Sequence, residues 1–196
     1  MPYKDPIKQK QAQKKHYLKN KKQYKDNRKK NIEKCKKWFR LYKSKLSCKK
    51  CKCNDARCLD FHHLNPEDKK FTITNGVRYG YAINRIKEEI KKCIVLCANC
   101  HMKEHWQFKK QITQKTSVKW LNEYKKQLSC IDCGLKDSFV LCFHHFLDKK
   151  NCVTWLAHRG KSIEVILEEI ANCEVVCCNC HRIRHNGNIW EKDSLE

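Results

Sequence analysis

The chain carries one pattern of cysteines twice, and this duplication constrains its fold more than any other feature of the 196 residues. The stretch WFRLYKSKLSCKKC at 38–51 aligns with WLNEYKKQLSCIDC at 120–133. Further along, EEIKKCIVLCANCHMKEH at 88–105 aligns with EEIANCEVVCCNCHRIRH at 168–185. Such a repeat indicates two copies of one small structural unit. Because a unit of this size buries only a marginal apolar core, a structural metal ion is expected to help stabilise each copy.

Each repeat contains two Cys-x2-Cys pairs, which together offer four soft thiolate ligands for one tetrahedral zinc ion. The N-terminus is rich in lysine rather than apolar, so we expect no secretory signal. In a reducing compartment, clustered cysteines beside histidines indicate metal binding rather than disulfides. We therefore predict two structural zinc sites, with buried free thiols as the alternative. The predicted ligands are Cys48, Cys51, Cys97 and Cys100 in the first repeat, and Cys130, Cys133, Cys177 and Cys180 in the second.

The other eight of the 16 cysteines carry weaker signals. Cys53 and Cys178 lie beside predicted zinc ligands and stay open as competitors for the metal. Cys93 and Cys173 each precede an apolar strand and are expected in the core. The remaining four are expected to act as small hydrophobic residues: Cys35, Cys58, Cys142 and Cys152.

Hydrophobic periodicity predicts an α+β chain that begins with a long lysine-rich helix, or several helices, over residues 5–46. Each repeat is then expected to contain a strand, a helix, a second short strand and a final helix. Ser162 is expected to cap one of these helices, and Gly187 to end the last one. The predicted strands are 59–63, 93–97, 140–145 and 173–177, and the predicted helices are 82–93, 99–110, 162–173 and 179–187.

Eight of the ten histidines fall at matched positions in the two repeats. His101 and His105 are four residues apart and therefore share one face of a helix. His62 and His63 adjoin at a strand end, where alternation points them in different directions. One histidine can then bind a metal while its neighbour faces a water or a substrate. The second repeat has the same set at His144, His145, His181 and His185, whereas His16 and His158 are expected at the surface.

The motif FHHLNP, followed by CIVLCANCHMKEH and flanked by cysteine pairs, resembles the zinc-containing HNH endonucleases, a branch of the His-Me finger nucleases. The resemblance covers both repeats, most of residues 45–190. It implies two tandem ββα-metal (His-Me finger) units, each stapled by a four-cysteine zinc site, with a basic helical arm before them. The implied domains are a DNA-binding arm at 1–37, a first HNH unit at 38–110 and a second at 118–190.

The resemblance implies hydrolysis of DNA phosphodiester bonds, with one Mg²⁺ or Mn²⁺ in each active unit beside the two structural Zn²⁺ sites. It assigns His63 and His145 as general bases. The ligands of the catalytic ions would be His62 and His101 in the first repeat, and His144 and His181 in the second. His105 and His185 would be third ligands or phosphate contacts. The alternative is that all these histidines serve structural zinc.

Each repeat departs from the family pattern at one position. The family's middle asparagine, which steadies the loop that carries the base, corresponds to Asn172 in the second repeat but to Lys92 in the first. The family's proline after the histidine pair corresponds to Pro66 in the first repeat but to Asp148 in the second. An enzyme with only one active unit therefore stays an alternative.

The net charge of +23 favours a polyanionic partner. The first 47 residues hold 18 lysines and arginines against three acidic residues. This region lacks the wide apolar face of a helix that binds a membrane surface, and dense lysines contact phosphates rather than bases. A solvated helix without a partner is the alternative. We expect DNA contacts from Lys14, Lys15, Lys21, Lys22, Arg28, Lys29, Lys30, Lys36, Lys37 and Arg40.

Together these features predict a metal-dependent DNA endonuclease. Two active centres in one chain could cut both strands of a duplex, so we expect a monomer that acts as a pseudo-dimer, without a membrane partner. The expected location is intracellular, in the cytoplasm or wherever the target genome lies. The alternatives are a non-catalytic zinc-containing protein that binds nucleic acid, and a nuclease directed at RNA.

Overall fold

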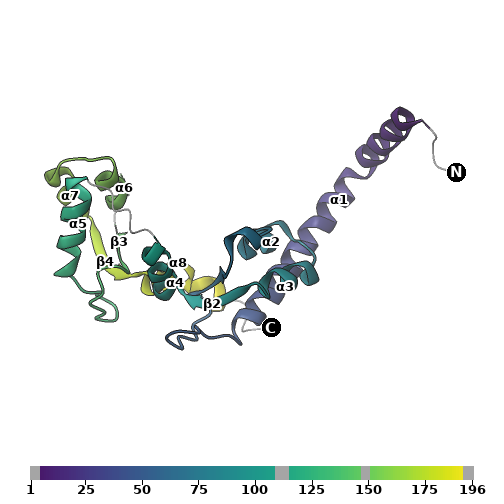
Figure 1. Cartoon of the computed structure of the whole chain (residues 1–196). Coiled ribbons are helices and arrows are strands. Elements are labelled where there is room, and N and C mark those ends of the chain that lie inside the picture. The colour runs from purple at the N-terminus through teal and green to yellow at the C-terminus, as the bar shows by residue number, and fades with distance from the viewer. Residues whose placement is uncertain (1–4, 109–114, 147–150, 192–196) are drawn as a thin grey trace. The chain divides into compact units, whose positions relative to one another are not determined.

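The computed structural model describes residues 5–108, 115–146 and 151–191 of the chain (Figure 1). Across these ranges the chain forms eight α-helices, one short 3-10 helix at Pro66–Asp68 and two separate two-stranded sheets. The predicted α+β class is therefore confirmed. No helix within the described ranges is long and apolar enough to cross a membrane.

The chain divides into two compact units, which we describe separately. One consists of the residues up to Tyr42 together with His63–Cys93, and the other of Lys43–His62 together with the chain from Ile94 onward. The domain boundaries expected from the repeats, at 1–37, 38–110 and 118–190, stay a prediction.

In the first unit, the helical structure predicted over residues 5–46 is confirmed as one continuous helix of 38 residues, α1 (Pro6–Lys43). Lysine and glutamine favour helix, and no glycine or proline interrupts the stretch after its first residue. The helices α2 (Ile73–Tyr79) and α3 (Ile83–Ile90) lie beside the later part of α1 (Figure 1). Gly80 ends α2 in a left-handed conformation, and a Cβ atom there would lie 2.8 Å from the side chain of Ile32. This close approach of α2 to α1 requires glycine.

The repeated strands form as predicted. β1 (Leu59–His63) pairs with β2 (Cys93–Cys97), and β3 (Leu141–His145) pairs with β4 (Cys173–Cys177). The second pair is antiparallel, with a register that runs from Leu141 opposite Cys177 to His145 opposite Cys173. In the described part of the chain, two α-helices separate the strands of each pair, and a further helix follows directly after β2 and after β4.

The remaining helices of the second unit are α4 (Ala98–Phe108), α5 (Thr116–Lys126), α6 (Val153–His158), α7 (Ile163–Ile170) and α8 (Cys178–Glu191). Ser162 occupies the N-cap position of α7, although its side chain makes no capping hydrogen bond. The prediction that the last helix ends near Gly187 is wrong, because α8 continues to Glu191. A glycine inside a helix costs only about 1 kcal/mol relative to alanine, so it does not force an end.

The two repeats pack against each other through α4 and α8. The backbone N–H of Asn99 donates to Asn179 Oδ1 at 3.1 Å, and the N–H of Asn179 donates to Asn99 Oδ1 at 3.0 Å. Each asparagine therefore caps the first turn of the other repeat's helix. Ile183 of α8 also packs on a core cluster of the first repeat that includes Leu59 and Leu96.

Candidate metal centres

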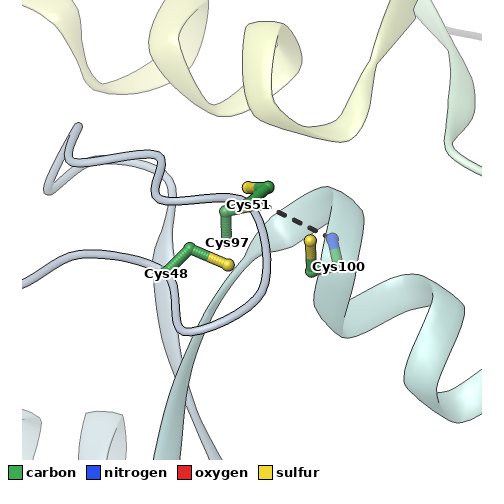
Figure 2. A group of neighbouring side chains, drawn as sticks. All are labelled: Cys48, Cys51, Cys97 and Cys100. Atoms are coloured by element: carbon green, nitrogen blue, oxygen red, sulfur yellow. Dashed lines mark hydrogen bonds between the residues drawn. The ribbon is translucent and has the colours of Figure 1, made fainter.

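The structure brings the two cysteine pairs of the first repeat together (Figure 2). Cys48 and Cys51 lie in the loop after α1, Cys97 ends β2, and Cys100 lies in the first turn of α4. The four sulfurs lie within 4.8 Å of one another. Cys130, Cys133, Cys177 and Cys180 form the same group in the second repeat.

The spacing of these sulfurs fits a tetrahedral zinc ion. With Zn–S bonds of about 2.3 Å, neighbouring sulfurs of such a site lie about 3.8 Å apart. The Sγ atoms of Cys51 and Cys97 are 3.5 Å apart, and those of Cys133 and Cys177 are 3.8 Å apart. Both groups therefore could bind zinc, and four thiolates leave no open coordination position for a water.

The backbone around each group favours thiolate. Burial raises the pKa of Cys48, but backbone hydrogen bonds at Cys51, Cys97 and Lys50 outweigh it and lower the pKa to about 6. In the second repeat, burial is likewise outweighed by backbone hydrogen bonds, and the pKa of Cys130 falls to about 7. Burial and the neighbouring thiols raise the pKa of Cys100. The neighbouring thiolates repel one another, and a bound divalent cation would offset this repulsion.

The two competing cysteines lie outside these groups. Cys53 accepts the backbone N–H of Cys48 through its carbonyl at 2.8 Å, which closes the turn between the first two ligands. The sulfur of Cys178 lies 3.2 Å from that of Cys142 instead. Cys35 and Cys58 are buried, as expected of small hydrophobic residues, whereas Cys152 is exposed.

Three histidines of each repeat form a second kind of group. His62 extends from β1 toward His101 and His105 of α4, with ring centroids 5.1 Å away in both cases. The Nε2 atoms of His101 and His105 are 3.1 Å apart, close to the roughly 3.3 Å expected for two imidazoles on one tetrahedral ion. In the second repeat His144, His181 and His185 form the same arrangement, and in both sets the ligand atoms lie within 4.8 Å of one another.

In the second three-histidine set, the surroundings of His144 favour its neutral form, which is the form of imidazole that binds a metal ion. Burial lowers the pKa of His144, and the neighbouring charges of His185 and Arg184 lower it further. His185 is exposed and His181 is half-buried, so the set opens to solvent. An ion there would keep an accessible side, in contrast to the closed cysteine groups.

The second histidine at the end of each of these strands, His63 of β1 and His145 of β3, contacts a buried glutamate. In the first unit, His63 Nε2 lies 3.1 Å from Glu89 Oε1, and the two side chains are 8% and 2% exposed. The same oxygen accepts the backbone N–H of Lys70 at 2.8 Å, and Lys92 Nζ contacts Oε2 at 2.8 Å. Burial raises the pKa of Glu89, but the hydrogen bonds from Lys92, Lys70 and His63 outweigh it and lower the pKa to about 2.

The second repeat has an equivalent histidine–glutamate pair, and we refer to each such pair as a dyad. His145 Nε2 lies 2.7 Å from Glu169 Oε1, which also accepts the backbone N–H of Asn151 at 3.0 Å. An ionised carboxylate can only accept hydrogen bonds, so a neutral imidazole in this contact has its proton on Nε2 and its lone pair on Nδ1. His144 and His145 thus contact different partners from consecutive positions of β3, as alternation along a strand requires.

Asn172 contacts α7 through its side chain and the residue after β3 through its backbone. Its Nδ2 donates to the carbonyl of Glu168, and its backbone carbonyl accepts the N–H of Phe146, the residue after the histidine pair. In the first repeat the carbonyl of Lys92 accepts the N–H of Leu64 in the same way. A backbone contact of this kind does not depend on the side chain, which explains how lysine can replace asparagine. Asp148 lies outside the described residues.

Three carboxylates that contact these histidines, Glu89, Glu169 and Asp60, were not predicted from the sequence. Glu89 and Glu169 lie at matched positions in the repeated EEI motif, so their recurrence was the available signal. Asp60 accepts a hydrogen bond from His101 at 2.9 Å and one from Arg182 at 2.7 Å. Burial raises the pKa of Asp60, but these two partners outweigh it and lower the pKa to about 2.

The basic residues expected to contact DNA all lie on α1. Most of them are exposed, whereas Lys36 and Arg40 are half-buried, and Lys36 forms an ion pair with Glu33 at 2.9 Å. Their arrangement gives a continuous basic helix.

No protein-family model, no curated protein and no solved structure matches the chain.

Proposed function

We propose that the protein is a metal-dependent endonuclease that hydrolyses DNA phosphodiester bonds, with one HNH-type centre in each repeat. One observation supports this most strongly. Consecutive residues of β3 supply a ligand to a three-histidine set, His144, and a histidine bonded to a buried carboxylate, His145. The first repeat has both groups at the corresponding consecutive residues, His62 and His63.

The donor atoms favour a transition-metal ion over the Mg²⁺ expected from the resemblance. Imidazole nitrogen suits Zn²⁺, Fe²⁺ and Ni²⁺, whereas Mg²⁺ prefers carboxylate, carbonyl and water oxygens. Mn²⁺ is the softer of the two ions that the resemblance implies, so it is the better candidate of that pair. A divalent ion in the set would supply positive charge that stabilises the phosphorane and the leaving oxygen.

The dyad supports a role for His145 as a general base. Glu169 accepts a hydrogen bond from Nε2–H and fixes the ring, so Nδ1 is the nitrogen that can take a proton from a water molecule. The water oxygen then bonds to phosphorus while the phosphorus–ester oxygen bond breaks, and the released alkoxide takes a proton from solvent. We propose the same role for His63, held by Glu89.

The basic helix α1 supports DNA as the substrate. Its exposed lysines can neutralise phosphates along the backbone, which gives affinity with little preference for sequence. Two centres in one chain would allow a double-strand break without dimerisation.

A second candidate function is a non-catalytic zinc protein that binds nucleic acid. It is favoured by the burial of the dyad histidines, since the side chains of His63 and His145 are only 8% and 10% exposed. A structural dyad would have this burial without any need for contact with a substrate.

Cleavage of supercoiled plasmid with Mn²⁺, Zn²⁺ or Mg²⁺ separates the two candidates. Loss of a general base should slow cleavage about 10²- to 10⁴-fold. We expect His63→Ala and His145→Ala each to convert linear product into nicked circle, and the double variant to be inactive. The matched control is His158→Ala, because that histidine is exposed at the end of α6 and belongs to no set. A double variant that cuts as well as the parent would refute the nuclease.

A further inference from the structure

Asp60 of β1 lies between the first three-histidine set and the second repeat. Its Oδ2 accepts a hydrogen bond from His101 Nδ1 at 2.9 Å and one from Arg182 Nη2 of α8 at 2.7 Å. The side chain is 23% exposed, so the contact is shielded from much of the solvent. The other ring nitrogen of His101, Nε2, faces His105 Nε2 in the set. His101 therefore directs one nitrogen to a carboxylate and the other to the candidate metal position.

This arrangement is suited to strengthen a metal ligand. A histidine that donates its second N–H to a carboxylate is held in one tautomer and one ring orientation, and its ligating nitrogen becomes more basic. Loss of such a partner typically lowers metal affinity about 10- to 100-fold. Arg182 in turn fixes the carboxylate, since its guanidinium also contacts the backbone carbonyl of Cys58 at 3.5 Å.

The second repeat does not carry the same residues. The motif LDFHH of the first repeat becomes LCFHH, so Cys142 occupies the position equivalent to Asp60. Its sulfur lies 3.2 Å from that of Cys178. Met102 stands in the first repeat where Arg182 stands in the second, and it is 44% exposed. The link from guanidinium through carboxylate to histidine thus runs from the second repeat to the first set.

We propose that Asp60, held in place by Arg182 of the second repeat, is a positioning residue that orients His101 as a ligand and strengthens metal binding at the first three-histidine set. Metal binding in the first repeat then depends on a side chain of the second. This inference rests on the proposed function, because it requires that the set binds a divalent ion.

The test uses the full chain with its cysteine groups loaded with zinc, and Co²⁺ as the probe. His144→Ala removes a ligand of the second set and leaves the first to be measured alone, and His62→Ala does the reverse. Visible d–d absorption of Co²⁺ reports binding, and the lack of a thiolate charge-transfer band verifies that zinc stays on the cysteines. Circular dichroism of each variant verifies folding.

In the His144→Ala background, we expect Asp60→Asn to weaken Co²⁺ binding about 10- to 100-fold. Arg182→Met, which copies the residue of the first repeat, should weaken it in the same direction. In the His62→Ala background, Asp60→Asn should leave Co²⁺ binding unchanged. The matched control is Asp137→Asn, which removes another carboxylate that pairs across the repeats, with Lys103, but contacts neither set.

Two results would overturn the inference, and they differ. Equal Co²⁺ affinity with and without Asp60 in the His144→Ala background would refute the positioning role alone. Failure of both single-set backgrounds to take up Co²⁺, with Asp60 intact, would show that the sets are not metal centres. In that case the proposed function falls as well.

Discussion

The buried glutamate of the first repeat provides the sharpest test of how the histidine pair is held. Glu89 and its neighbour Glu88 both lie on α3 and both pair with a lysine three residues later, at 2.8 Å in each case. The Glu88 side chain is 68% exposed, whereas that of Glu89 is 2% exposed. Replacement of Glu88 or Glu89 by glutamine therefore removes the same charge from two different environments.

The structure sets the expected magnitudes. Glu89→Gln can keep one oxygen as acceptor for His63 and Lys70, but it removes the charge from three hydrogen bonds, so we expect a loss of about 2 kcal/mol in the free energy of unfolding. Glu89→Leu leaves the buried donors of His63 and Lys70 without an acceptor, and we expect a loss of about 3–5 kcal/mol. Glu88→Gln should change stability by less than about 0.5 kcal/mol.

Urea denaturation at neutral pH, followed by circular dichroism, measures these differences. The pH dependence gives a second check, because the pKa of Glu89 is lowered from 4.5 to about 2. The Glu89 carboxylate therefore contributes fully to the free energy of unfolding above pH 4.5, and this contribution should be lost as the pH falls toward 2. The parent should show this loss, and Glu89→Gln should not. Equal destabilisation by Glu88→Gln and Glu89→Gln would contradict the account of a buried dyad.

Further predictions concern the turns, the zinc groups and the basic helix. Lys52 has a left-handed backbone conformation with φ of 62°, and the equivalent residue of the second repeat is Gly134, with φ of 72°. Because glycine adopts this conformation without strain, Lys52→Gly should raise the free energy of unfolding by about 0.5–1 kcal/mol, as measured by thermal denaturation. An unchanged or lower melting temperature would contradict the proposed backbone strain at Lys52. Cys97→Ser should remove one zinc ion per chain, as measured by atomic emission. It should also lower the melting temperature, since structural zinc contributes folding free energy. The control Cys93→Ser changes a cysteine outside the group and should keep the zinc. Affinity for duplex DNA should fall about 10³- to 10⁵-fold between 50 and 200 mM salt if α1 contacts 6–10 phosphates, and a flat response in a fluorescence-anisotropy titration would exclude that role.

The sequence predicts the two four-cysteine groups and the strands well because both are encoded locally. A Cys-x2-Cys pair has the spacing of a metal-binding turn, and its recurrence in each repeat identifies the partner pair. Alternation in LDFHH predicts both a strand and the divergence of His62 from His63. Helical spacing places His101 and His105 on one face, which the structure confirms.

The contacts that hold the histidines could not be predicted in the same way. Glu89 lies on an otherwise amphipathic helix, where a glutamate ordinarily faces solvent. It accepts the backbone N–H of Lys70, 19 residues earlier in the chain, and no local pattern encodes this contact. Asp60 and Arg182 are 122 residues apart, so their contact follows only from the packing of one repeat on the other.

The central claim is that each repeat combines a closed four-cysteine centre with an open three-histidine centre. The most direct measurement is the metal content of the purified chain after saturation with Zn²⁺ and removal of free ion. The account predicts four ions per chain for the parent, one for each group, and two for the His62→Ala/His144→Ala double variant. Two ions in both proteins would contradict it, because the histidine sets would then hold no metal.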